Sequence, residues 1–204
     1  SISKTLVKSS SLSPSAVLAG VSLGYSGVIV VLIDPTLPKE EINRLLMESD
    51  VRGAFATNKM YEQLDSDIVC QIPIFCINAV ETSVKRFTSS ASKVLLEETP
   101  DRHFDVAAIL FSSGTTASMK GIMLTWHSVM RSRDLFADVS GMSTKTSYLV
   151  VFPYNHVSGY SSTMMYFLTG CSMGMIENVN ASKLAEGLQS YMPHHFGMVP
   201  KVYD

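Results

Sequence analysis

Two apolar runs separated by a short polar stretch dominate the middle of the chain, between Val106 and Leu124. The first run, Val106 to Phe111, has the length and character of a buried strand. The second run begins at Ile122, directly after a Lys-Gly pair. The pattern predicts two strands joined by a loop that is rich in Ser, Thr and Gly.

The residues of this loop suit the binding of an anion. Gly114 allows backbone amides to approach a ligand closely, and Lys120 supplies a positive charge on a flexible stem. Hydroxyl groups add hydrogen-bond donors at four positions: Ser112, Ser113, Thr115 and Thr116. The composition of the loop therefore indicates a phosphate site.

Two other interpretations of this loop remain open. Ser, Thr and Gly are common in ordinary turns, so the loop could be a plain polar connection. A Walker loop also places a lysine after a glycine-rich run. That motif requires a second glycine where the chain has Met119, and a Ser or Thr where it has Gly121. A strand also follows the loop, whereas a helix follows a Walker loop.

The stretch F-S-S-G-T-T-A-S-M-K-G-I-M-L-T resembles the phosphate-loop signature of the AMP-forming adenylating enzymes. This family includes acyl-CoA synthetases, the adenylation domains of peptide synthetases and firefly luciferase. Its usual form is [YF]-[ST]-[ST]-G-[ST]-T-G-x-P-K-G-[VI]. The chain departs from it at Ala117, which replaces a glycine, and at Met119, which replaces a proline.

A second stretch, V-F-P-Y-N-H-V-S-G-Y, resembles the family passage P-[LMF]-x-H-x-x-G. The resemblance implies that His156, between Pro153 and Gly159, borders the carboxylate and acyl pocket. The alternative is that His156 caps the helix that follows it. Two further histidines, His194 and His195, lack a carboxylate or Cys partner at ligand spacing, so they are interpreted as the start of a strand.

The resemblance implies a ligase that joins a carboxylic acid to ATP, releases pyrophosphate and passes the acyl group from AMP to a thiol. The cofactors would be ATP and Mg²⁺, and the thiol would belong to coenzyme A or a carrier protein. Thr115, Thr116 and Lys120 would face the β- and γ-phosphates, and Lys120 and His156 would be catalytic. The hydroxyl of Ser112 would help to hold the magnesium ion.

The remaining pattern predicts an α/β fold with a mostly parallel sheet and helices on both faces. Val28 to Ile33 is interpreted as a central parallel strand, preceded by a helix that begins at Pro14 and ends before Gly24. Asp34 is expected to cap a turn. The resemblance makes residues 1–204 one subdomain of the large N-terminal lobe, with its phosphate loop at 111–121. The C-terminal domain would be absent, and this portion alone would not turn over.

Composition limits the other possibilities. A net charge of −2 gives no electrostatic reason to expect nucleic acid as a partner. The cysteines number three and lack metal-type spacing, which favours buried free thiols in a reducing compartment, the cytoplasm. The apolar stretch from Ala16 to Ile33 is interrupted by glycines and serines, so it is interpreted as the core of a soluble domain with no transmembrane segment.

Two function classes compete with the ligase. In a degenerate, non-catalytic member of the family, Ala117 and Met119 would record the loss of ATP use, and the domain would serve for binding or protein contact. A flavodoxin-like cofactor binder is the third possibility. It requires a phosphate loop between a strand and a helix, whereas this loop is predicted to join two strands.

Overall fold

The computed structural model describes residues 4–7, 14–77, 105–112, 119–176 and 179–197. Six of its strands form one sheet in the order β4-β3-β1-β2-β5-β6. All neighbouring pairs are parallel except β5 and β6, which form an antiparallel hairpin. The strands of this sheet are β1 (Lys4–Val7), β2 (Ile29–Leu32), β3 (Ala54–Ala56), β4 (Ile74–Cys76), β5 (Val106–Ser112) and β6 (Lys120–Thr125).

Strand β2 lies in the interior of the six-stranded sheet and is buried on both faces. Val30 and Leu32 pack in a cluster with helix α1 (Pro14–Tyr25). Val31 and Ile33 pack in a second cluster on the opposite face, with helix α2 (Lys39–Glu48). Because successive side chains of a strand point to opposite faces, a strand covered on both sides needs a continuous apolar run.

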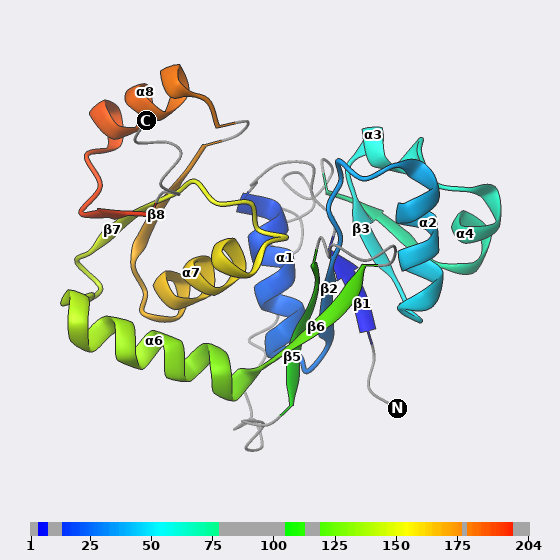
Figure 1. The fold of residues 1–204 in the computed structure, drawn as a ribbon, viewed down its shortest axis with the longest axis horizontal. Coiled ribbons are helices and arrows are strands. Elements are labelled where there is room, and N and C mark those ends of the chain that lie inside the picture. Colours follow the sequence, from blue (N-terminus) through cyan, green and yellow to red (C-terminus); the bar gives the residue numbers. More distant parts are fainter. Residues whose placement is uncertain (1–3, 8–13, 78–104, 113–118, 177–178, 198–204) are drawn as a thin grey trace, which may run out of the picture.

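The second face of the sheet is covered by α2, α3 (Asn58–Tyr61) and α4 (Ser66–Gln71), as Figure 1 shows. The inward face of α2 carries Ile42, Leu45 and Leu46, all fully buried. Before α2, the carboxylate of Asp34 accepts hydrogen bonds from the backbone N–H and the hydroxyl of Thr36, at 2.8 and 2.7 Å. The predicted capping role of Asp34 is therefore confirmed.

The second half of the chain forms a smaller parallel sheet in the order β8-β7-β9. The expected α/β architecture, with mostly parallel strands and helices on both faces, is confirmed, and the strands fall into two sheets. The elements of this half are α6 (Trp126–Ser140), β7 (Ser147–Val150), α7 (Val157–Leu168), β8 (Ser172–Met175), α8 (Ala181–Tyr191) and β9 (His195–Phe196).

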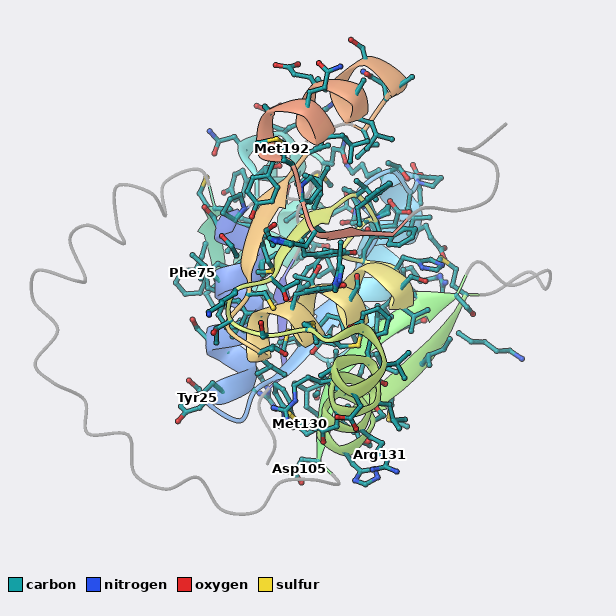
Figure 2. The ribbon with its side chains drawn as sticks, turned by 90° about the vertical axis from the view of Figure 1, so that its left-hand side faces the viewer. Tyr25, Phe75, Asp105, Met130, Arg131 and Met192 are labelled. Carbon is teal, nitrogen blue, oxygen red and sulfur yellow. The ribbon has the colours of Figure 1, made fainter. Side chains whose placement is uncertain are left out.

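The two sheets share a core. Tyr148 and Val150 of β7 belong to the same buried cluster as Leu110 of β5 and Ala16 and Val17 of α1. Helix α1 accordingly lies between the sheets in Figure 1. Figure 2 shows Tyr25, at the end of α1, and Met192, after α8, at opposite ends of the molecule. Packing across α1 therefore fixes the relative position of the two sheets.

Two expectations from the sequence were wrong. Helix α1 continues through Gly24 to Tyr25. Trp126 packs where a side chain on Gly24 would lie, which explains the glycine within the helix. Cys70 is exposed and the other two cysteines are half-buried, although all three are free. The short helix α4 was not expected. Among the described residues, no helix is long and apolar enough to cross a membrane.

Candidate functional site

The β5–β6 hairpin brings two of the predicted anion-binding residues together at the end where β5 leads into the loop and β6 begins. Ser112 and Lys120 are directly opposite each other in the antiparallel register. Directly opposed residues have their Cβ atoms about 5 Å apart, so a hydroxyl and an ammonium group can reach one ligand. The other predicted loop residues, Ser113, Gly114, Thr115 and Thr116, lie outside the described residues, as does Ala117.

The register also decides the face on which this pair lies. Leu110 and Ile122 form the pair two residues further into the hairpin, so Ser112 and Lys120 share their face. Leu110 packs in the cluster that contains α1 and α7. The ammonium group of Lys120 is exposed and the side chain of Ser112 is half-buried. Both polar groups therefore lie on the α1 and α7 side of the sheet.

The opposite face of the hairpin is apolar and packs against the core. Ile109, Phe111 and Met119 pack against the cluster formed with α2. Gly121 is opposite Phe111, and a Cβ on Gly121 would lie 3.2 Å from Cγ2 of Ile109. Met119, at the position of the family proline, therefore packs against the core directly before β6. A side chain at Gly121 would be crowded by Ile109.

His156 is the N-cap residue of α7. Its Nδ1 accepts a hydrogen bond from the backbone N–H of Ser158 at 3.2 Å. Its own backbone N–H donates to the carbonyl of Pro153 at 3.0 Å. The capping role considered for His156 is therefore confirmed. Since a neutral imidazole carries one proton, the accepting Nδ1 places that proton on Nε2, and the exposed side chain offers a donor.

Gly159 permits the tight approach that forms this turn. A Cβ on Gly159 would lie 1.9 Å from the carbonyl oxygen of Pro153, which no side chain tolerates. The Pro, His and Gly of the second motif thus form one turn at the start of α7. In Figure 1 this first turn of α7 points toward the β5–β6 hairpin.

Two further contributors to this turn were not found from the sequence. Ser158 supplies the N–H that holds the imidazole. Tyr154, between Pro153 and Asn155, is buried, and its ring lies against Gly20 of α1. The spacing of a glycine after the histidine could have indicated the cap. Nothing local in the sequence pairs Tyr154 with a glycine far earlier in the chain.

No metal centre is formed by the part of the chain that the structure describes, since it contains no group of three His, Cys, Asp or Glu side chains that could hold an ion. His194 instead accepts at Nδ1 from the N–H of Ser147, at 3.1 Å. The Nδ1 of His195 lies 3.0 Å from the hydroxyl of Tyr166. Both histidines therefore connect β9 to its neighbours, as expected for the start of a strand.

Comparison of the sequence with known proteins identifies the family of this chain. Residues 10–204 match the AMP-binding enzyme family. A relative from Arabidopsis thaliana, 4-coumarate--CoA ligase-like 6, is 27% identical over 191 residues. That alignment covers 88% of this chain and 34% of the relative. The chain thus spans about a third of the length of this curated relative.

Solved structures show the same fold. The o-succinylbenzoate CoA synthetase from Bacillus subtilis, in complex with the acyl-adenylate intermediate OSB-AMP, matches with a TM-score of 0.79 and 16% identity. A long-chain-fatty-acid-CoA ligase from Archaeoglobus fulgidus matches with a TM-score of 0.80 and 21% identity. These matches cover 99% and 98% of this chain, and 50% and 40% of the other chains.

Proposed function

Because this chain belongs to the AMP-binding enzyme family, we propose that it is part of an ATP-dependent acid-thiol ligase. The enzyme converts a carboxylic acid and ATP to an acyl adenylate and pyrophosphate, and then transfers the acyl group to a thiol such as coenzyme A. The observation that carries this proposal is the Ser112 and Lys120 pair at the loop end of the hairpin. We propose that the enzyme acts in carboxylic-acid metabolism, and three free cysteines are compatible with the reducing cytoplasm.

The chemical difficulty of the first step is electrostatic. A carboxylate oxygen must approach the negatively charged α-phosphate, so positive charge and hydrogen-bond donors have to offset the repulsion. The exposed ammonium group of Lys120 and the hydroxyl of Ser112 supply both from neighbouring strands. We propose that Ser113, Gly114, Thr115 and Thr116 complete the cradle around the phosphates. When bound, Mg²⁺ neutralises phosphate charge; its contact with Ser112 rests on the resemblance alone.

His156 acts on the acid. With Nδ1 occupied by the N–H of Ser158, the neutral imidazole presents an N–H donor at Nε2. A donor at this place binds and orients a carboxylate oxygen and cannot remove a proton. This role does not conflict with capping, because the cap uses one ring nitrogen and leaves the other for the substrate. We therefore propose that His156 positions the carboxylate of the acid.

The test is release of pyrophosphate by the intact protein with Mg²⁺, ATP and a panel of carboxylic acids. We expect release with at least one acid, and a decrease of about 10²- to 10³-fold in Lys120→Ala, the range seen when one preorganised charge-stabilising donor is removed. Lys120→Arg keeps the charge and serves as the matched variant. Absence of release with every acid, or equal rates in wild type and Lys120→Ala, would contradict the proposal.

A non-catalytic binding module is the second candidate, and the packing of Met119 favours it. Met119, which replaces the family proline, packs against the cluster that contains α2, and we propose that this substitution accompanies binding of nucleotide without turnover. Titration with MgATP separates the candidates. Saturable binding that Lys120→Ala weakens, together with no pyrophosphate from any acid, would identify a binding module.

A further inference from the structure

We infer that Tyr154 is a positioning residue that sets the orientation of His156. The two residues lie on one short turn before α7, separated by Asn155. Tyr154 is 5% exposed and His156 is exposed, so one end of the turn is inside the core and the other faces the candidate site. The inference rests on the proposed role of His156 in binding the acid.

The phenol ring of Tyr154 fits against α1 only because residue 20 is glycine. A Cβ at Gly20 would lie 2.9 Å from the Tyr154 hydroxyl oxygen and 3.4 Å from Cε1. Gly20 is buried within the helix, and the helix itself packs on the central sheet. The ring therefore rests on an element that cannot move without disturbing the core.

The other side of the ring contacts α7. The ring centroids of Tyr154 and Tyr160 are 5.4 Å apart, and the hydroxyl of Tyr154 lies 3.9 Å from the sulfur of Met164. Burial raises the pKa of the Tyr154 hydroxyl well above its ordinary value, so the group stays neutral between the helices. Tyr154 thus separates α1 from α7 at the level of the turn.

The backbone of the same turn is held independently. The carbonyl of Pro153 accepts the N–H of His156 at 3.0 Å and packs on Gly159 with no space for a side chain. Because the carbonyl of Pro153, directly before Tyr154, is fixed, we infer that a displacement of the ring is passed to the residues that follow it. His156 is the first of these with a functional side chain.

Tyr154 could instead be an ordinary core residue. In that case its disturbance would lower stability and leave the imidazole as it is. If Tyr154 positions His156, a disturbance of Tyr154 changes the hydrogen bond between Ser158 and His156. Stability measurements do not report this change. The two explanations therefore differ in the state of one ring nitrogen.

The test uses two glycine substitutions on α1 and one substitution of the tyrosine. Gly20→Ala pushes a methyl group into the Tyr154 hydroxyl. Tyr154→Phe removes that hydroxyl oxygen. Gly24→Ala is the matched control, because its Cβ would also meet an aromatic atom at 2.9 Å, on Trp126, which is not part of the turn. The measurements on the intact protein are the ¹⁵N NMR signature of the His156 ring nitrogens, pyrophosphate release against acid concentration, and thermal unfolding.

We expect Gly20→Ala to reduce the Nδ1-acceptor signature of His156 and to raise KM for the acid about tenfold, since small displacements of a positioning group cost up to 10²-fold. The double variant Gly20→Ala/Tyr154→Phe should restore the signature and bring KM to within about threefold of Tyr154→Phe alone. Gly24→Ala should leave the signature of His156 unchanged.

An unchanged signature in Gly20→Ala, or equal changes in Gly20→Ala and Gly24→Ala, would overturn the inference. If Gly20→Ala does not fold, Tyr154→Leu tests the same link without a clash, and an unchanged signature there is also decisive. The signature requires no turnover. Its change in a protein that releases no pyrophosphate would support the inference and contradict the proposed ligase instead.

Discussion

Strands β2 and β6 lie in one sheet and have opposite environments. Every residue of β2 is buried, and its neighbours on both edges are parallel strands. Strand β6 is at the edge of the sheet, and its first four residues, from Lys120 to Met123, are exposed. The sequence of β2 is apolar throughout, whereas β6 begins with Lys-Gly and ends in a helix cap.

The difference shows how the fold divides stability from chemistry. A strand buried on both faces contributes transfer free energy at every residue and cannot carry an exposed charge. An edge strand with an open side can hold an ammonium group in solvent, next to the loop that we propose binds the phosphates. The following substitutions separate these two contributions.

The largest expected effect is on β2. Leu32→Ala should lower the free energy of unfolding by about 3 kcal/mol, because the 2%-exposed side chain leaves a cavity in the cluster around α1. Chemical denaturation measures this effect. Leu18→Ala, on the exposed side of α1, should change the free energy of unfolding by less than about 0.5 kcal/mol. Equal effects at both positions would remove the distinction between centre and surface.

The next effect concerns chemistry at the hairpin end. Ser112→Ala should slow pyrophosphate release about tenfold, because a hydrogen bond to a charged group contributes on the order of 1.5 kcal/mol. The melting temperature should stay within about 2 °C of wild type. Ser172→Ala, an exposed serine of β8, is the control for loss of a hydroxyl. A fall in stability without a fall in rate would make Ser112 a structural residue.

A smaller effect is expected where β6 ends. The hydroxyl of Thr125 accepts the N–H of Ser128 at 3.2 Å and caps α6. Thr125→Ala should therefore lower the free energy of unfolding by about 1 kcal/mol in denaturant titrations. Thr125→Ser retains the cap and should recover most of the loss. If serine and alanine are equally destabilising, packing and not capping is the contribution of this residue.

The smallest effect is expected on the exposed part of β6. Met123 is 66% exposed and is opposite Ile109 in the register. Met123→Ser should change the free energy of unfolding by less than about 0.5 kcal/mol, measured by the same denaturation. A loss above about 2 kcal/mol would show that β6 is covered in the protein and that the comparison with β2 does not hold.

The sequence alone determined the elements whose local pattern is strong. The apolar run of Val28 to Ile33 predicted the central strand, and the two runs around the polar loop predicted the hairpin. The family was also readable from the phosphate-loop stretch. These features depend on short-range periodicity and residue chemistry, which do not require knowledge of distant partners.

Only the tertiary structure decided what distant residues do to one another. Gly24 would end a helix by propensity, yet it lies within α1, where Trp126 of α6 packs against it. Leu135 and Phe136 of α6 are large apolar residues, yet both are exposed, at 53% and 41%. The ring of Tyr154, two residues before His156, packs against Gly20, far away in the sequence. Local patterns specify which backbone forms, but close approach between elements follows from three-dimensional packing, which the linear sequence does not display.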